Sequence, residues 1–152
     1  MSGDVLVVIP ARGGSKGVPG KNLARVGGVP LVVRAIRAAQ MAQRVTAVAM
    51  STDDPTIAAA ATAAGAIAVE RPPDLAGDEA TSEAALSHAV ETLYGSHAAG
   101  PEVLVMAQCT SPFLTAHDLD GVVGAVLDEG ADSAFTAAPS HAFLWRIATE
   151  AH

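Results

Sequence analysis

A glycine-rich, cationic loop directly after an apolar strand is the feature of this sequence that most constrains its fold. Residues 4–9 (Asp-Val-Leu-Val-Val-Ile) are almost continuously apolar and β-branched, which is typical of a strand buried on both faces of a parallel sheet. Residues 9–22 then place Arg12, Lys16 and Lys21 among four glycines. Glycine lets the backbone approach an anion closely, and the cations donate charge-assisted hydrogen bonds to phosphate oxygens. The pattern predicts a polyphosphate site at the end of a buried strand.

The loop matches neither of the two common phosphate-binding patterns. A Walker A pattern ending at Gly20 and Lys21 would need glycine where Ser15 stands, and serine or threonine where Asn22 stands. A dinucleotide fingerprint ending at Gly20 would also need glycine at Ser15. A solvated turn between strand and helix is the alternative to phosphate binding, because glycine and proline are common in such turns.

The charge of the chain indicates a small anionic ligand rather than a polymer. There are nine Lys and Arg against sixteen Asp and Glu, for a net charge of -7, and four of the nine cations lie within residues 12–25. A chain this acidic is not expected to bind nucleic acid or an anionic membrane, since both draw on extended basic surfaces. The sequence shows no apolar run long enough to span a bilayer and no signal-peptide pattern at its start. We therefore expect a cytoplasmic protein with a small-molecule partner.

The length and composition predict one domain over residues 1–152. Half of the 152 residues are hydrophobic but only 3% are aromatic, so the core must close through many small side chains. Phe143, Leu144 and Trp145 place three large apolar side chains near the end of the sequence. Such a hydrophobic end predicts a partner surface or a domain that is truncated at its C-terminus.

Apolar strands that alternate with helical patterns predict a three-layer, doubly wound α/β fold with a mostly parallel sheet. Pro55 suits the first position of a helix capped by Asp53 or Asp54, with Gly65 past its end. Residues 115–118 resemble a capping box. The expected strands are residues 4–9, 45–51, 66–69, 103–107 and 132–138, and the expected helices are 30–44, 55–64, 80–95 and 115–129.

Four polar side chains follow expected strands directly: Arg12, Asp53, Arg71 and Gln108. Ligands of doubly wound sheets bind at the carboxyl ends of the strands, near the point where the strand order reverses. We therefore expect these four residues to cluster at one edge of the sheet.

Several other polar residues are interpreted as structural. Cys109 is the only cysteine, which excludes an internal disulfide, and we expect it to pack as a small side chain. Asp53 and Asp54 are expected to cap a helix rather than bind metal. Asp118 and Asp120 would point about 200° apart on a helix, so we expect both to be solvated. No pair of histidines has metal-ligand spacing.

Four further motifs accompany the first loop in a recognisable order. They are Ser-Thr-Asp-Asp at residues 51–54, Arg-Pro-Pro-Asp-Leu-Ala-Gly-Asp at 71–78, Ala-Thr-Ser at 80–82 and Gln-Cys-Thr-Ser-Pro-Phe at 108–113. Together these motifs strongly resemble the N-terminal part of the acylneuraminate cytidylyltransferases, the CMP-sialic acid synthetases. The resemblance is dense over residues 5–113 and loose beyond. It implies a fold of the nucleotide-diphospho-sugar transferase type and the transfer of CMP from CTP to the anomeric hydroxyl of a sialic acid, with release of pyrophosphate.

The resemblance also implies a role for each motif. Arg12, Lys16 and Lys21 would be the catalytic residues that contact the triphosphate. Gln108 and Ser111 would bind the acceptor sugar, where amide and hydroxyl groups suit a polyhydroxylated substrate. The nucleotide-binding residues would be Ala11, Arg12, Gly13, Gly14, Ser15, Lys21, Asn22, Arg71, Ala80 and Ser82, with Asn22 near the ribose and the last three at the cytosine.

By the same resemblance, the expected substrates are CTP and an acidic nine-carbon sugar, the cofactor is Mg²⁺ with ligands not assigned, and the protein forms a homodimer when a further C-terminal segment is present. Two other hypotheses stay open. One is a non-catalytic nucleotide-binding remnant. The other is a sibling cytidylyltransferase for another acidic sugar, such as 3-deoxy-octulosonate or legionaminate.

Overall fold

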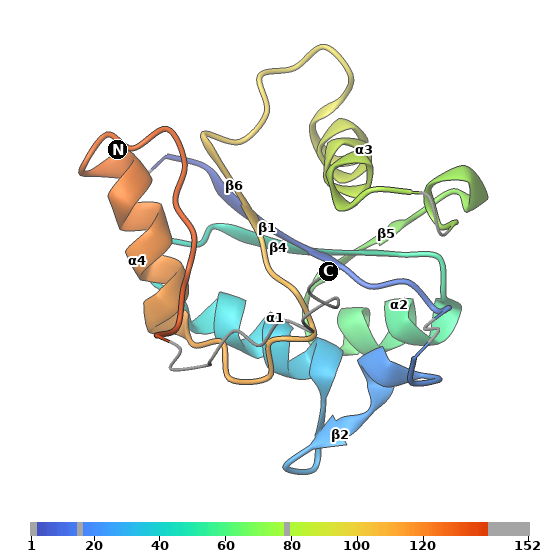
Figure 1. The fold of residues 1–152 in the computed structure, drawn as a ribbon. Coiled ribbons are helices and arrows are strands. Elements are labelled where there is room, and N and C mark those ends of the chain that lie inside the picture. The colour runs from blue at the N-terminus through green and yellow to red at the C-terminus, as the bar shows by residue number, and fades with distance from the viewer. Residues whose placement is uncertain (1–2, 15–16, 78–79, 140–152) are drawn as a thin grey trace, which may run out of the picture.

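The fold is built on a four-stranded parallel sheet. The computed structural model describes residues 3–14, 17–77 and 80–139. The strand order in the sheet is β5-β4-β1-β6 (Figure 1), and both neighbours of β1 run parallel to it. Burial on both faces explains the apolar runs, because Val5 to Ile9 are all fully buried. The strands are β1 (Val5–Pro10), β4 (Ala47–Thr52), β5 (Ile67–Glu70) and β6 (Val103–Met106).

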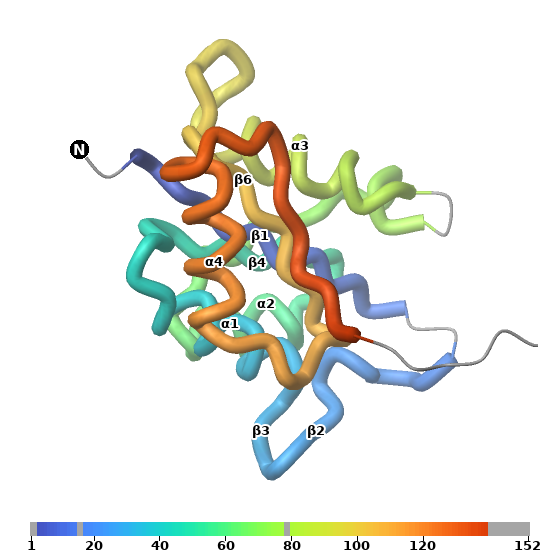
Figure 2. The backbone as a smooth tube through the Cα atoms, turned by 60° about the vertical axis from the view of Figure 1, so that its left-hand side comes forward, coloured from blue at the N-terminus to red at the C-terminus, as the bar shows by residue number. Residues whose placement is uncertain are grey.

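Helices cover both faces of this sheet. Helices α1 (Leu31–Met41) and α2 (Pro55–Ala63) pack on the face that presents Val7 and Ile9, and α4 (Ala116–Leu127) packs beside α1. Helix α3 (Ser82–Tyr94) covers the other face alone, and Figures 1 and 2 show this separation. The expected three-layer, doubly wound α/β fold is confirmed.

The strand order places the switch point between β1 and β6. From β1 the chain moves outward through β4 to β5, and then crosses back to β6 on the other side of β1. Because crossover connections between parallel strands are right-handed, this reversal moves the connecting helix α3 to the opposite face. The carboxyl ends of β1 and β6 therefore open a crevice where the connections diverge.

The helices α2 and α4 have the N-terminal caps that the sequence predicts. Asp54 is the N-cap of α2 and accepts hydrogen bonds from the backbone N–H groups of Thr56 and Ile57, at 2.7 and 3.1 Å. Pro55 is the first residue of that helix, and Gly65 lies past its end with φ 86°. Thr115 and Asp118 form the expected reciprocal capping box at the start of α4.

The segments around α1 and the crevice differ from the expectation. Helix α1 ends at Met41 rather than Arg44. A small hairpin, β2 (Arg25–Val26) with β3 (Val29–Pro30), stands before α1, so Pro30 ends a strand rather than lying within the helix. Two short 3-10 helices, η1 (Lys21–Leu23) and η2 (Pro73–Leu75), lie in the loops around the crevice.

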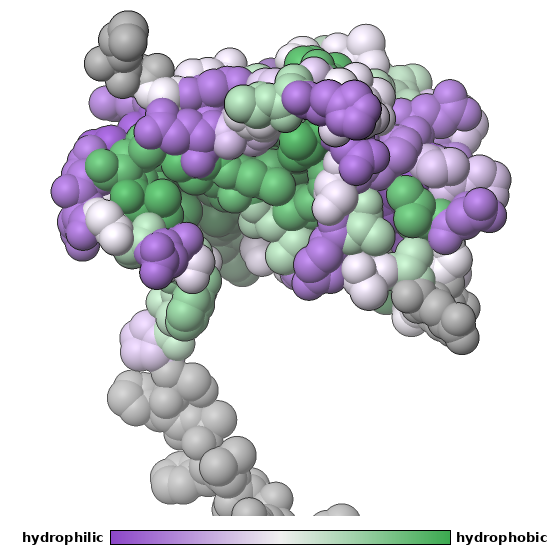
Figure 3. All heavy atoms as spheres, turned by 90° about the horizontal axis from the view of Figure 1, so that it is seen from above, coloured by the Kyte–Doolittle hydropathy of each residue, from purple (hydrophilic) through white to green (hydrophobic). Residues whose placement is uncertain are grey.

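Residues 132–138 form no strand, so the expected fifth strand is wrong. A strand needs a neighbour with which to exchange backbone hydrogen bonds. A cavity of about 840 Å³ is lined by β6, α4 and this segment instead, and Phe135 is 86% exposed. The space-filling view shows apolar side chains gathered around a hollow on the face seen there (Figure 3). The apolar residues 143–145 lie outside the described residues.

Asp120 is not solvated in the way the helical spacing suggested. Its carboxylate accepts hydrogen bonds from the backbone N–H groups of Gln43 and Arg44, at 3.1 and 2.9 Å. These residues lie between α1 and β4, so Asp120 on α4 satisfies backbone donors that follow the end of another helix. Asp118 belongs to the capping box instead.

Candidate nucleotide-binding site

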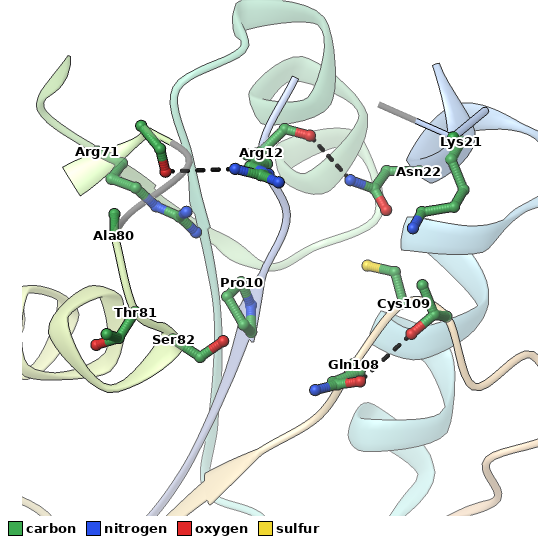
Figure 4. Close-up of a pocket in the computed structure, with 13 residues that line it drawn as sticks. Pro10, Arg12, Lys21, Asn22, Arg71, Ala80, Thr81, Ser82, Gln108 and Cys109 are labelled. Carbon is green, nitrogen blue, oxygen red and sulfur yellow. Dashed lines mark hydrogen bonds between the residues drawn. The ribbon is translucent and has the colours of Figure 1, made fainter. Parts of the chain in front are cut away.

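A cavity of about 480 Å³ opens at the switch point. Figure 4 shows its lining side chains converging from four segments: the loop after β1, the loop after β5, the start of α3 and the loop after β6. Most of the residues chosen from the sequence meet there, as expected from their positions after strands. They are Arg12, Lys21, Asn22, Arg71, Ala80, Ser82 and Gln108.

Some candidates lie elsewhere. Ala11 is buried behind the cavity, where its N–H donates to the Ser51 carbonyl at 2.9 Å. Gly13 and Gly14 are not among the lining residues, and Ser111 lines the cavity beside β6 instead. Ser15 and Lys16 lie outside the described residues. Six lining residues were not chosen from the sequence as site residues: Pro10, Gly17, Gly77, Thr81, Cys109 and Thr110.

The first loop is fixed to the end of β4. The N–H of Gly13 donates to Oδ1 of Asp53 at 2.9 Å. A Cβ atom at Gly13 would lie 2.7 Å from Oδ2 and 2.9 Å from Cβ of Asp54, closer than such atoms approach. Glycine at this position is therefore required by the close packing of the loop on the β4–α2 turn.

Lys21 and Asn22 reach the cavity from the short helix η1. Gly20 precedes this helix with φ 63°, a conformation that glycine adopts readily. Asn22 is 7% exposed, and its Nδ2 donates to the carbonyl of Arg12 at 3.0 Å. This contact ties η1 to the loop after β1, while Lys21 extends over Cys109 (Figure 4).

The two arginines of the cavity have different surroundings. Arg12 donates from Nη1 to the carbonyl of Gly77 at 3.3 Å, which links the loops after β1 and β5. Arg71 is 7% exposed, and it donates from Nε to the Ser51 hydroxyl at 3.1 Å and from Nη2 to the Ser51 carbonyl at 2.7 Å. Two of the guanidinium nitrogens are therefore bonded to the protein itself, which nothing in the sequence indicated.

Burial lowers the pKa of Arg71 from its ordinary value. The negative charge of Asp53 opposes this fall, and the positive charge of Arg12 adds to it. The guanidinium still titrates far above neutral pH, because arginine is charged under essentially all protein conditions. The three residues thus form one electrostatic group at the inner wall of the site.

The N-terminus of α3 forms another wall. Thr81 is the N-cap and accepts a hydrogen bond from the N–H of Ala84 at 3.2 Å, and Ser82 is the first helical residue. Ser82 therefore both opens the helix and lines the cavity. The first turn of a helix leaves backbone N–H groups without helical partners and carries partial positive charge.

The loop after β6 supplies the remaining wall. The Thr110 hydroxyl donates to Oε1 of Gln108 at 3.4 Å, a long hydrogen bond that orients the amide. Cys109 is 3% exposed, and burial raises the pKa of its thiol to about 12, against the opposing charge of Lys21. The expectation that Cys109 packs rather than reacts agrees with this burial. Thr110 could have been found from its membership of the same sequence motif as Gln108, two positions earlier.

The charge of the lining is positive, and no carboxylate contributes to it in the described part of the chain. The nearest acidic pair is already engaged, because Asp53 holds Gly13 and Asp54 caps α2. Within residues 3–14, 17–77 and 80–139 there is no group of three or more His, Cys, Asp or Glu side chains that could hold a metal ion. The described lining therefore fits an anionic ligand, and it assigns no ligands to the expected Mg²⁺.

A positively charged cavity at the switch point is consistent with the protein family that the sequence matches. Residues 6–145 match the family described as Cytidylyltransferase. The chain belongs to the cytidylyltransferase family. The resemblance noted from the five motifs is thus confirmed at the level of the family.

Relatives of this cytidylyltransferase include enzymes named for two different acidic sugars. A 3-deoxy-manno-octulosonate cytidylyltransferase of Anaeromyxobacter sp. (strain Fw109-5) is 38% identical over 89% of this chain and 51% of its own length. N-acylneuraminate cytidylyltransferase A of Danio rerio is 34% identical over 93% of this chain and 32% of its own length. The chain spans about half or less of the relatives it matches, and these matches do not single out sialic acid.

Solved structures give the same fold. The structure of CMP:2-keto-3-deoxy-manno-octonic acid synthetase complexed with CTP has a TM-score of 0.67 and 26% identity, over 84% of this chain and 49% of that chain. A 4-diphosphocytidyl-2C-methyl-D-erythritol synthase has a TM-score of 0.70 over 96% of this chain and 64% of that chain. At 13% identity the second likeness shows the fold alone.

The helices of the described residues are all too short or too polar to span a bilayer.

Proposed function

We propose that this protein transfers CMP from CTP to the anomeric hydroxyl of an acidic sugar and releases pyrophosphate. The observation that carries the proposal is the cationic cavity at the switch point, lined by Arg12, Lys21 and Arg71 without a carboxylate among the described residues, in a chain of the cytidylyltransferase family. The acceptor is an N-acylneuraminate or 3-deoxy-manno-octulosonate, because relatives named for each sugar match most of this chain.

The proposed reaction needs positioning and charge neutralisation more than covalent help from the protein. The anomeric oxygen of the acceptor attacks the α-phosphorus of CTP, the bond to pyrophosphate breaks, and the hydroxyl proton passes to solvent. Arg12 and Lys21 would hold the triphosphate and stabilise the charge that develops on the leaving pyrophosphate. Lys16 remains part of the proposal from its place in the loop.

The rest of the cavity would place the base and the acceptor. Arg71, Ala80 and Ser82 lie together on the side of α3, and we assign the cytosine to them. Gln108 is assigned to the acceptor, because it lines the cavity after β6. Ser111 lines the other cavity, which Gln108 also lines, so its contact with the acceptor stays a prediction.

Mg²⁺ remains an expected cofactor and a dimer an expected assembly. No step is assigned to Mg²⁺, because the described residues contain no set of carboxylates suited to hold it. Removal of divalent metal with EDTA is therefore part of the assay, and the requirement for metal is read directly from the rate.

The test measures pyrophosphate release by the purified chain with CTP and Mg²⁺. N-acetylneuraminate and 3-deoxy-manno-octulosonate are supplied in parallel, with sugar-free and EDTA controls, and UTP, GTP and ATP compete with CTP. Release that depends on one sugar identifies the acceptor. Absence of release with either sugar, together with measurable CTP binding, would favour a non-catalytic nucleotide-binding module. The absence of a carboxylate from the described cavity lining makes that second function worth testing.

A further inference from the structure

Arg34 on α1 makes three hydrogen bonds to backbone carbonyls of two other segments of the chain. Its Nε and Nη2 donate to the carbonyl of Pro112 at 3.1 and 3.0 Å. Its Nη1 donates to the carbonyl of Val26 at 3.3 Å. The side chain is half-buried. One guanidinium therefore joins the loop after β6 to the hairpin before α1.

This contact consists of hydrogen bonds to backbone carbonyls rather than an ion pair, and we call it the Arg34 clamp. Within the described residues Arg34 forms no salt bridge with a carboxylate, so its donors are directed at carbonyl oxygens. A hydrogen bond from a charged donor is roughly twice as strong as a neutral one. The planar fork also fixes the direction of all three bonds, which a lysine cannot do.

Both of the clamped segments continue into the nucleotide cavity. Val26 follows the short helix η1, which carries Lys21 into the cavity. Pro112 follows Gln108 through a turn in which the N–H of Ser111 donates to the carbonyl of Gln108 at 3.1 Å. The hairpin and the β6–α4 loop lie next to each other at one end of α1 (Figure 1).

The two clamped segments lie next to each other at the cavity: Figure 4 shows Lys21 extending towards Cys109, the residue after Gln108. Lys21, Gln108 and Cys109 all line the cavity, and the charge of Lys21 partly opposes the rise in the pKa of the Cys109 thiol that burial causes. Lys21 stands on the triphosphate side and Gln108 on the acceptor side of the proposed reaction. The distance between these two sides decides whether an attacking hydroxyl and a phosphorus atom meet in line.

We infer that Arg34 is a positioning residue that sets the gap between Lys21 and Gln108, and so aligns the acceptor sugar with the nucleotide. This inference rests on the proposed function. Arg34 itself lines neither cavity, so it acts through the two carbonyls that it holds. Loss of the clamp should widen the acceptor side while the triphosphate contacts stay in place.

The test compares Arg34→Lys and Arg34→Met with Arg37→Met, a matched control that removes an exposed arginine from the same helix. Three quantities are measured for each: CTP affinity by calorimetry without acceptor, acceptor-dependent pyrophosphate release, and backbone amide exchange by mass spectrometry. We expect Arg34→Met to lower kcat/KM for the acceptor by at least about tenfold, in the range that small misplacements cost, and to leave CTP affinity within about twofold. Arg34→Lys retains one donor group and should fall between Arg34→Met and the wild type.

Amide exchange separates this role from a general loss of stability. Residues 20–26 and 108–114 should both exchange faster in Arg34→Met, while the strands β1 and β4 keep their protection. Equal losses of CTP affinity and acceptor kcat/KM, or faster exchange throughout the sheet, would overturn the inference, as would unchanged exchange in the two segments. Failure of the wild type to bind CTP would instead contradict the proposed function, and the exchange data would still decide whether Arg34 holds the segments.

Discussion

Asp53 and Gly13 are joined by a hydrogen bond of 2.9 Å, in which the Gly13 N–H donates to Oδ1 of Asp53. The bond spans 40 positions of sequence and connects the first loop with the turn after β4. Its neighbour Asp54 caps α2 instead. Two adjacent aspartates that the sequence left interchangeable therefore have different roles, one holding the candidate phosphate loop and the other opening a helix.

Asp53→Ala should weaken CTP binding by about 1 kcal/mol, the usual net value of one hydrogen bond, because the loop loses its fixed position. Asp53→Asn should weaken it less, since the amide oxygen still accepts the bond. Calorimetric titration with CTP measures both. Asp54→Ala is the control: it should lower the free energy of unfolding by about 1 kcal/mol with a smaller change in CTP affinity. Equal CTP affinity in Asp53→Ala and the wild type would show that the Asp53–Gly13 hydrogen bond does not hold the loop for nucleotide binding.

Arg12→Ala and Lys21→Ala should each weaken CTP binding by about 1.5 to 3 kcal/mol, as expected for a lost hydrogen bond to a charged group. The dependence of affinity on salt should also become shallower, because fewer charges meet the triphosphate. Titrations at two ionic strengths give both quantities. Arg37→Ala, on the exposed side of α1, should match the wild type. If both cavity variants bind CTP normally, the loop is not the phosphate site.

Arg71→Ala should reduce the preference for CTP over UTP while sparing much of the triphosphate affinity. It should also destabilise the fold by about 1 to 3 kcal/mol, because the buried hydroxyl and carbonyl of Ser51 lose the hydrogen bonds from the guanidinium, while the carbonyl keeps the one from the Ala11 N–H. The ratio of the two nucleotide dissociation constants is measured together with urea unfolding. An unaltered ratio would remove Arg71 from the base pocket even if stability falls.

Cys109 should react slowly with a thiol reagent in the folded protein at pH 8 and rapidly in urea. Burial raises the pKa of this thiol from 9.0 to about 12, and the thiolate is the reactive form. Because the thiol has a higher pKa in the folded state than in the unfolded state, its contribution to the free energy of unfolding is fully present below the unfolded pKa. This contribution should therefore be lost as pH rises from about 9 to 12. Rapid native labelling at pH 8 would contradict the burial.

Asp120→Ala should destabilise the protein by about 1 to 2 kcal/mol, in line with the loss of a side chain that caps backbone donors. Its carboxylate accepts from two N–H groups, those of Gln43 and Arg44. Urea unfolding measures the change. Asp132, an exposed aspartate that follows α4, is the control. Asp132→Ala should leave the free energy of unfolding unchanged. Similar behaviour of the two variants would mean that Asp120 is solvated after all.

The elements that could be predicted are those whose signal lies within a few neighbouring residues. The buried strand at Val5–Pro10 shows an apolar run, and the start of α4 shows a capping box between Thr115 and Asp118. Residues 132–138 failed as a strand for the opposite reason. Their place after a helix in the alternating pattern says nothing about a pairing neighbour, and pairing decides whether a strand forms.

The candidate site was predictable where residues directly follow parallel strands. The polar residues after β1, β5 and β6 had to meet, because the carboxyl ends of parallel strands share one edge, and Arg12, Arg71 and Gln108 do line one cavity. Thr81 was missed because a helix cap gives no sign of which cavity it faces. Ser111 was included because it belongs to the same motif as Gln108, yet the turn at this loop directs it to the other cavity.

The sequence by itself determined the four strands of the parallel sheet and the four α-helices, the glycine-rich cationic loop and the family, because these depend on local periodicity, turn residues and motif order. Only the tertiary structure decided that Asp53 holds Gly13, that Ser51 engages Arg71 and that Arg34 clamps two loops. The contacts of Gly13 with Asp53, of Arg71 with Ser51 and of Arg34 with Pro112 join residues 40, 20 and 78 positions apart, whereas Arg34 and Val26 are 8 positions apart. Their existence depends on distances of about 3 Å that packing alone sets, and no pattern along the chain encodes them.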